Sequence, residues 1–163
     1  MGEEALLELE EVTFRHRNRR MRDMWRTKRG AGIFSISLKI NSGTVLGLIG
    51  PNGAGKTTLL NLMIGLNPED SGVVRLLGKS RRHMDRAKAQ SKIGLMPERV
   101  SWSGTSTPRS TLVRFQTMRG ENGDVSDLLA LVGLSSRADT PLDDLSQGMR
   151  QRLSLACALM GSP

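Results

Sequence analysis

Short apolar runs separated by turn-forming residues fill the first hundred positions, and this pattern predicts strands. Residues 33–40 place Phe34, Ile36, Leu38 and Ile40 on one face and polar residues on the other, which predicts a half-buried strand. The nearly continuous apolar run at 44–49 is typical of a strand buried on both faces of a parallel sheet. Three further strands are predicted, at 6–14, 73–78 and 93–96.

Helical periodicity dominates the second half of the chain. A strongly apolar helix is predicted after residue 58 and is expected to end at Gly65, and a polar helix is predicted at 81–90. Later helices are predicted at 109–119, at 125–132 and from Ser146, as the N-cap, to about Met160. Alternation of strands and helices early, with helices clustered late, predicts an α/β fold with an inserted helical subdomain.

Composition narrows the class of protein. The 163 residues suit one domain, and the low aromatic content of 3% implies a core built from aliphatic side chains and Met. No apolar run approaches the ~18 to 20 residues that a membrane helix requires. A single Cys157 excludes an intrachain disulfide and fits a reducing compartment. We therefore expect a soluble, cytoplasmic protein.

The net charge of +8 comes partly from residues 15–30, where eight Lys and Arg residues accompany one acidic residue. Such a run is typical of an exposed, solvated loop, and it can also form a contact with nucleic acid or acidic lipid. Trp25 is the only aromatic residue within it. Since nucleic-acid surfaces interleave aromatic and basic side chains, nucleic acid is not expected as a partner.

A glycine-rich segment, GPNGAGKTT at 50–58, fits the phosphate-binding loop pattern G-x-x-x-x-G-K-[ST] and lies between a predicted strand and a predicted helix. In such a loop, backbone N–H groups form a concave anion site, Lys56 reaches the β- and γ-phosphates, and the Thr57 hydroxyl binds Mg²⁺. The sequence therefore predicts a site for a nucleoside triphosphate with Mg²⁺. Its candidate residues are Gly50, Pro51, Asn52, Gly53, Ala54, Gly55, Lys56, Thr57 and Thr58.

A second motif, LSQGMRQRL at 145–153, resembles the LSGGQ signature of ATP-binding cassette (ABC) proteins. Gln147 stands where the signature has its first glycine and Met149 where it has glutamine, whereas Ser146 and Gly148 are retained. The resemblance implies that Ser146 and Gly148 contact the γ-phosphate of ATP held by the P-loop of a second cassette. A second ABC cassette is thus an implied partner.

Two further landmarks of the family are matched. The segment KIGLMPE, 92–98, resembles the strand and loop that carry a glutamine in most cassettes, with Glu98 as the variant associated with exporter-type ATPases. This resemblance implies that Glu98 reaches the Mg²⁺ or the attacking water, near the transmembrane partner. The adenine-stacking aromatic residue of the family has its nearest counterpart in His16, with Trp25 as the alternative.

The resemblance implies an exporter-like ABC transporter ATP-binding protein. We expect a P-loop NTPase core of the ABC type, with an antiparallel β portion and a helical subdomain. The expected divisions are 1–98 for the ATP-binding core, 99–145 for the helical subdomain and 146–163 for the signature helix. Its ligands would be ATP and Mg²⁺ and its partner a transmembrane permease subunit, which places it peripherally on the cytoplasmic face of the membrane.

The chain reaches Pro163 without the Walker B aspartate, the catalytic glutamate or the switch histidine of the family. From this we expect a fold that is incomplete C-terminally, exposed apolar surface with low stability, and no ATP hydrolysis, so no catalytic residue is assigned. Two other interpretations stay open. One is a soluble ABC protein that acts on the ribosome or on nucleic acid, and the other is a non-catalytic truncated remnant.

Overall fold

The computed structural model describes residues 5–16, 32–85, 89, 91–98, 101–161 and 163. The chain divides into two compact units, Met1–Gln90 and Ser91–Pro163. Each unit has its own hydrophobic core, so each is stabilised by its own set of buried residues. Most of the basic run lies outside the described residues, and of its members the structure describes Arg15 and His16.

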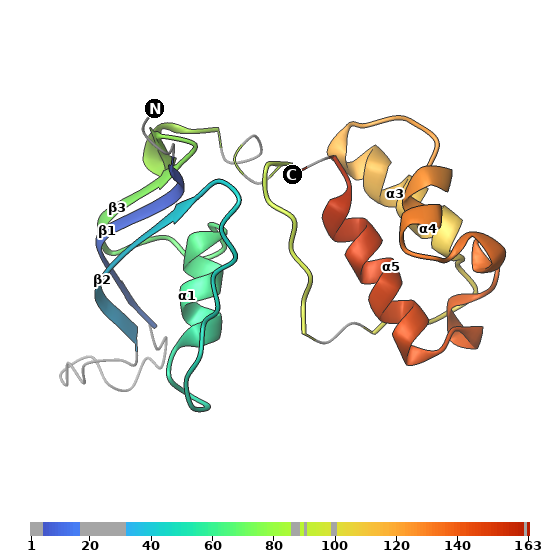
Figure 1. The fold of residues 1–163 in the computed structure, drawn as a ribbon, viewed down its shortest axis with the longest axis horizontal. Helices are drawn as coiled ribbons and strands as arrows, with labels where there is room; N and C mark the ends of the chain where they lie inside the picture. Colours follow the sequence, from blue (N-terminus) through green and yellow to red (C-terminus); the bar gives the residue numbers. More distant parts are fainter. Residues whose placement is uncertain (1–4, 17–31, 86–88, 90, 99–100, 162) are drawn as a thin grey trace, which may run out of the picture. The chain divides into compact units, whose positions relative to one another are not determined.

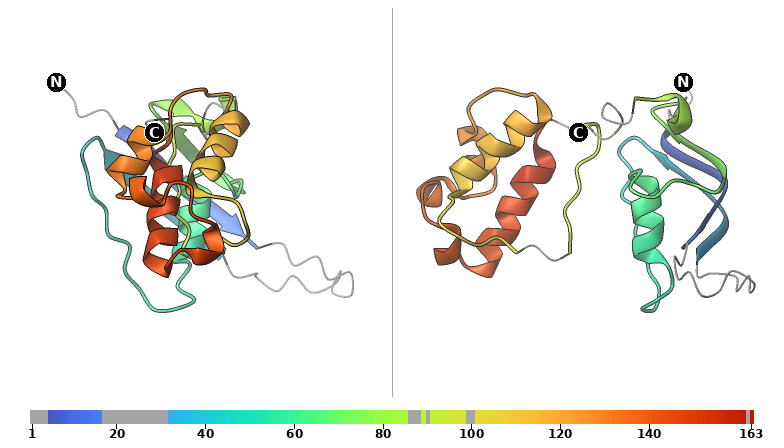
Figure 2. Two further views of the ribbon diagram at one scale, coloured as in Figure 1. Left: turned by 90° about the vertical axis from the view of Figure 1, so that its right-hand side faces the viewer. Right: turned by 180° about the vertical axis from the view of Figure 1, so that it is seen from behind.

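In its described residues, the first unit consists of an antiparallel sheet with an α-helix against it (Figure 1). The sheet comprises β1 (Ala5–Arg15), β2 (Gly32–Asn41), β3 (Ser71–Leu76) and β4 (Lys79–Ser80), in the order β2-β1-β3-β4. The helix α1 (Lys56–Met63) runs beside β1 and β2, as the second view in Figure 2 also shows. The predicted strands at 6–14, 33–40 and 73–78 are confirmed, and so is the end of α1 before Gly65, whose φ is 80°.

An irregularity in β2 makes one detail of the predicted alternation wrong. Ile33 is 8% exposed and Phe34 is 48% exposed, whereas strict alternation predicts Phe34 on the inner face. The cause lies at Ser35, whose positive φ of 47° coincides with a shift in the register between β1 and β2. A bulge of this kind moves the following side chains to the other face. The guanidinium of Arg15 lies 5.7 Å from the centre of the exposed Phe34 ring.

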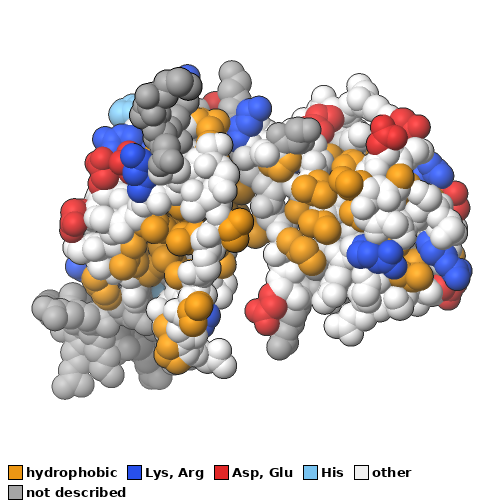
Figure 3. Space-filling model, viewed as in Figure 1, with side chains coloured by type: hydrophobic (Ala, Val, Ile, Leu, Met, Phe, Trp, Pro, Cys, Tyr) orange, Lys and Arg blue, Asp and Glu red, His pale blue; other side chains and the backbone are white. Residues whose placement is uncertain are grey.

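The predicted strand at 44–49 does not form: these residues have no regular secondary structure and pair with no strand in the described part of the chain. Val45 and Ile49 are 98% and 96% exposed, so the prediction of a strand buried on both faces is wrong. A strand needs a hydrogen-bonded neighbour, and the four-stranded sheet supplies none beside this segment. The expected exposure of apolar surface is confirmed, and Figure 3 shows apolar side chains over the connection between β2 and α1. The predicted strand at 93–96 likewise does not form.

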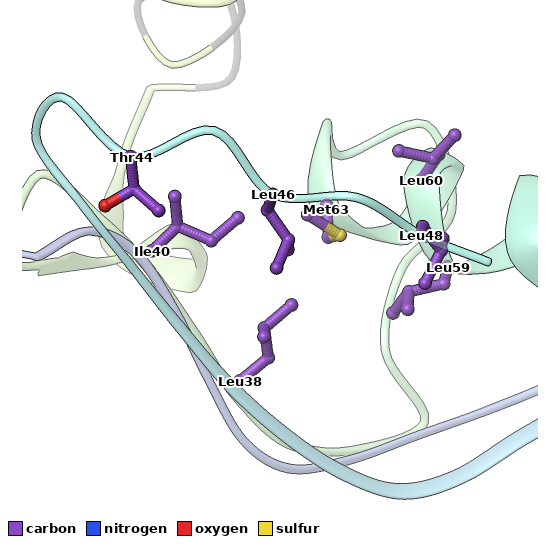
Figure 4. Close-up of a pocket in the computed structure, with 8 residues that line it drawn as sticks. All are labelled: Leu38, Ile40, Thr44, Leu46, Leu48, Leu59, Leu60 and Met63. Carbon is purple, nitrogen blue, oxygen red and sulfur yellow. The ribbon is translucent and has the colours of Figure 1, made fainter.

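An apolar cavity of about 240 Å³ lies between β2, the 44–49 segment and α1. Figure 4 shows Leu38 and Leu46 pointing toward one another across it. The buried core of this unit is small: Leu9, Val12, Leu62 and Val74. The interior of the first unit is therefore only partly filled.

The polar helix predicted at 81–90 does not begin as one continuous helix. A 3₁₀ turn, η1 (Arg81–His83), is followed by extended backbone at Met84, with φ −95° and ψ 144°. That extended residue interrupts the helical hydrogen-bond ladder after one turn. Residues 86–88 and 90 lie outside the described residues, so the rest of this prediction stays a prediction.

Three helices surround the core of the second unit: α3 (Pro108–Arg119), α4 (Ser126–Leu131) and α5 (Gln147–Leu159). Two 3₁₀ turns, η2 (Ser135–Arg137) and η3 (Leu142–Asp144), connect α4 to α5. All three helices agree with the sequence-based predictions. The buried core combines residues of the three helices and η3 with residues of the connections between them: Leu112, Val125, Leu129, Val132, Leu134, Ala138, Leu142, Leu145, Leu153, Ala156 and Met160.

Candidate functional site

The glycine-rich loop takes the backbone conformations that its sequence predicts. Gly53 has φ 84° and Gly55, the N-cap of α1, has φ 91°. Both values lie in the left-handed region, which glycine adopts without steric cost and most other residues avoid. A Cβ added to Gly53 would meet no heavy atom within 4 Å, so the requirement there is conformational. These turns direct the chain from the 44–49 segment into α1.

The first turn of α1 carries the donors of the candidate anion site. Its first helical hydrogen bond runs from Leu59 N to Gly55 O, at 2.8 Å. The N–H groups of Lys56, Thr57 and Thr58 come before that bond and so have no acceptor within the helix. In the described structure, no side chain caps this helix. N–H groups at a helix N-terminus, together with the helix dipole, favour a bound anion. This end of α1 is therefore available to a phosphate group.

Lys56 lies folded across its own loop. Its Nζ donates hydrogen bonds to the carbonyl oxygens of Gly50, at 2.6 Å, and Pro51, at 2.8 Å. The ammonium group is thereby held at the loop, beside the N-terminus of α1. Thr57, the second residue of α1, is exposed, which leaves its hydroxyl accessible from solvent. An ammonium, a hydroxyl and a row of N–H groups form a donor set suited to a phosphate chain with its Mg²⁺.

His16 is brought to the P-loop helix from the end of β1. Its Nε2 lies 3.2 Å from Oγ1 of Thr58, and its ring meets that of Phe14 edge to face at 5.0 Å between centroids. The sequence suggested His16 as a ligand residue, and the structure places it beside this candidate site. Its alternative, Trp25, lies outside the described residues.

The signature segment forms the N-terminus of α5. Ser146 is the N-cap, and its Oγ accepts a hydrogen bond from Met149 N at 3.3 Å, which confirms the predicted cap. Gly148 is exposed, and a Cβ added there would meet no heavy atom within 4 Å. A glycine inside a helix costs about 0.5–1 kcal/mol relative to alanine. Packing among the described residues therefore gives no reason for glycine at 148.

The residues of the signature segment that follow Gly148 serve the fold of the second unit. Met149 packs against its hydrophobic core. Arg150 Nε donates to Leu142 O at 3.2 Å, and Arg152 donates to Gly133 O at 2.9 Å, beyond the C-terminus of α4. Sequence reasoning did not find these bonds, because each arginine reaches a carbonyl of a segment far along the chain. They fix α5 against the turns that precede it.

The candidate residues fall into two groups. His16 and the loop residues 50–58 are brought together within the first unit, whereas Ser146 and Gly148 share the start of α5 in the second. Glu98 is an exposed residue of the second unit. In the described ranges, no group of three or more His, Cys, Asp and Glu residues could hold a metal ion.

None of the helices that the structure describes is long and apolar enough to cross a membrane.

Comparison with known proteins identifies relatives. The sequence model of the ABC transporter family matches residues 33–163. The chain is 39% identical over 133 residues to the Nod factor export ATP-binding protein I of Sinorhizobium fredii, across 78% of this chain and 38% of that protein. It is 35% identical over 137 residues to the linearmycin resistance ATP-binding protein LnrL of Bacillus subtilis, across 78% of this chain and 42% of that protein. The chain thus spans about two fifths of the length of these curated relatives.

Solved structures show the same fold. A structure of an ATP-binding subunit of an ABC transporter has a TM-score of 0.75 at 21% identity, over 97% of this chain and 63% of that one. A bacterial Atm1-family ABC exporter with ATP bound has a TM-score of 0.76 at 18% identity, over the whole of this chain and 28% of that one. The fold, the P-loop geometry and the match over 33–163 lead to one conclusion. The chain belongs to the ABC transporter family.

Proposed function

We propose that this chain forms part of the ATP-binding subunit of an exporter-like ABC transporter and binds MgATP at residues 50–58. The observation that carries the proposal is the start of α1. There, two glycines with positive φ open the loop, the first-turn N–H groups are uncapped, and Lys56 lies across the loop through bonds to Gly50 and Pro51. This arrangement supplies positive charge and hydrogen-bond donors to one small volume.

Each candidate residue has a defined role in the proposal. Lys56 exchanges the carbonyls of its own loop for oxygens of the β- and γ-phosphates, and the backbone from Gly53 to Thr58 surrounds them. The Thr57 hydroxyl would hold the Mg²⁺ that the nucleotide brings, and for Glu98 the proposal keeps the role that the family resemblance implies, a contact with the ion or the attacking water. The metal supplies neutralisation of phosphate charge.

Ser146 and Gly148 serve the nucleotide of another cassette. Ser146, Gln147 and Gly148 are exposed at the start of α5, and Gly148, which has no side chain, lets a phosphate approach that backbone closely. This arrangement supports a proposed head-to-tail pair of cassettes, with ATP between the P-loop of one and the signature of the other.

The assembled protein would act with a transmembrane permease subunit on the cytoplasmic face of the membrane. The names of the relatives from Sinorhizobium fredii and Bacillus subtilis, which concern export and resistance, support this assignment. Because the chain spans about two fifths of those relatives, transport is proposed for the whole assembly. For this chain alone, we propose the binding of MgATP and nothing further.

The proposal is tested by titrating the 163-residue chain with MgATP in a calorimeter. Lys56→Ala should lower the affinity at least tenfold, on the order expected for losing a charge-assisted hydrogen bond. The matched control is Lys39→Ala, which removes an exposed lysine from β2 and should leave the affinity unchanged. Equal binding by the wild type and Lys56→Ala, or no binding by the wild type, would refute the proposal.

A further inference from the structure

We propose that His16 binds the phosphate chain of the nucleotide and does not stack on its base. The inference rests on the proposed function, because it assigns a role within the same P-loop site. It departs from the role that the family resemblance gives to this position, where an aromatic face contacts adenine. Three observations carry it: where the imidazole hydrogen-bonds, what fixes the ring, and which groups share its surroundings.

The polar edge of the imidazole is directed at the anion-binding end of α1. Nε2 of His16 lies 3.2 Å from Oγ1 of Thr58, the third residue of that helix. At a rise of about 1.5 Å per residue, Thr58 lies within the first turn. The N–H groups of that turn are the ones available to a phosphate. A phosphate bound there therefore lies within the neighbourhood of the imidazole nitrogen.

The position of His16 is fixed by contacts of the residues that precede it at the end of β1. The Phe14 ring meets the imidazole edge to face, with an angle of 83° between the rings. The end of β1 is held to the turn before β3 by two hydrogen bonds, from Asp70 N to Thr13 O at 2.8 Å and from Arg15 N to Asp70 Oδ2 at 2.7 Å. His16 is thus placed by bonds on the residues next to it, and its direction is a property of the fold.

The surroundings of His16 suit a phosphate. Lys56 Nζ donates to the carbonyls of Gly50 and Pro51 in the loop that precedes α1. The Thr58 hydroxyl can either donate or accept a hydrogen bond. Nε2 of His16, which now pairs with the Thr58 hydroxyl, can carry a proton and donate it in a hydrogen bond to a phosphate oxygen when one is bound. Hydrogen bonds to an ionised acceptor are about twice as strong as neutral ones. The site then gains a second side-chain donor to the phosphates besides Lys56.

Two probes separate the phosphate role from base stacking: inorganic triphosphate with Mg²⁺, which has no base, and adenosine, which has no phosphate. In the 163-residue chain, His16→Phe keeps an aromatic ring and removes the donor. We expect it to lower triphosphate affinity about tenfold and to leave adenosine binding unchanged. His16→Gln, which keeps a donor at similar reach, should retain triphosphate affinity within about threefold of the wild type.

The opposite pattern would overturn the inference: unchanged triphosphate affinity in His16→Phe, or a loss of adenosine binding in His16→Gln with triphosphate binding intact. Lys56→Ala separates this result from the proposed function. A wild type that binds neither MgATP nor triphosphate contradicts both proposals. Binding that depends on Lys56 but not on His16 contradicts this inference alone. A circular dichroism spectrum of each variant verifies its fold, and retained binding by His16→Gln shows that a loss in His16→Phe reflects the donor.

Discussion

One buried carboxylate organises the far end of the P-loop helix. Glu69 is 5% exposed and pairs with both Arg81 and Arg82. Arg81 also donates to the carbonyl oxygens of Leu62, at the end of α1, and Asn67. Cations near a helix C-terminus offset its partial negative charge. Glu69 therefore holds in place the arginine that completes α1, the helix whose other end is the proposed phosphate site.

The charge of Glu69 makes this part of the molecule sensitive to acid. Burial on its own raises the pKa of the carboxyl, but a backbone hydrogen bond and the hydrogen bonds and charge of Arg81, with Arg82, outweigh it and hold the pKa below the ordinary value of 4.5. A lowered pKa in the folded state stabilises the protein above the unfolded value, and this stability is lost as the pH falls through the folded pKa.

We expect Glu69→Gln to lower the free energy of unfolding by about 1–3 kcal/mol near neutral pH, because it removes the negative charge that pairs with Arg81 and Arg82. The difference in unfolding free energy between the variant and the wild type should shrink as the pH falls below about 4.5. Glu69 is protonated first in the unfolded chain and, at lower pH, in the folded one as well. Urea titrations at several pH values measure it. Asp139→Asn, in the exposed pair with Arg109, should change stability by less than about 1 kcal/mol. A difference between Glu69→Gln and wild type that is constant from pH 7 to about pH 3 would contradict this account.

At the scale of elements, most local signals were read correctly, the predicted helix at 81–90 being an exception, and two errors came from features that depend on a neighbouring segment. The helices, the Ser146 cap and the loop glycines follow from residues close together in sequence, and all were predicted. The segment 44–49 has the composition of a buried strand but depends on a pairing partner, so composition alone misplaced it. Phe34 was misplaced because nothing in the alternation announces the positive φ at Ser35.

The candidate site shows the same division. The P-loop could be predicted in full because its chemistry and its conformation lie within nine consecutive residues. The bond between His16 and Thr58 joins positions 42 residues apart, and the sequence offered only the residue type. Its direction depends on Phe14 and on the turn at Asp70, which come together only in the folded sheet.

At the start of α5, the residue that caps the helix, Ser146, lies two positions before Gly148, which is proposed to let a phosphate approach. Ser146→Ala removes the N-cap bond to Met149 and should cost about 1 kcal/mol. Gly148→Ala should instead be neutral or stabilise the chain by up to about 1 kcal/mol, because the added methyl meets no atom. Thermal unfolding of both variants, with the exposed Ser101→Ala as a control, measures the contrast. A destabilising Gly148→Ala would mean that the fold itself requires this glycine.

At the scale of the whole molecule, the two units are stabilised unequally. In the described residues, the buried core cluster of the second unit contains eleven residues and that of the first contains four. The first unit also has a cavity of about 240 Å³ and leaves Val45 and Ile49 almost fully exposed. Burial of apolar surface is the main favourable term in folding, at roughly 25 cal/mol per Å². The first unit should therefore be the weaker of the two.

We predict that increasing urea removes hydrogen-exchange protection from β1, β3 and α1 before it affects α3 and α5. Core truncations should act on one unit at a time, because each core is separate: Val74→Ala should lower protection in the first unit and Leu129→Ala in the second. The leucine truncation should cost about 2–5 kcal/mol. If both units lost protection at the same urea concentration, and each truncation lowered protection in both units, the chain would unfold as a single cooperative structure. Because the P-loop belongs to the weaker unit, bound nucleotide should raise protection there first, since a ligand that binds only the folded state stabilises what it touches.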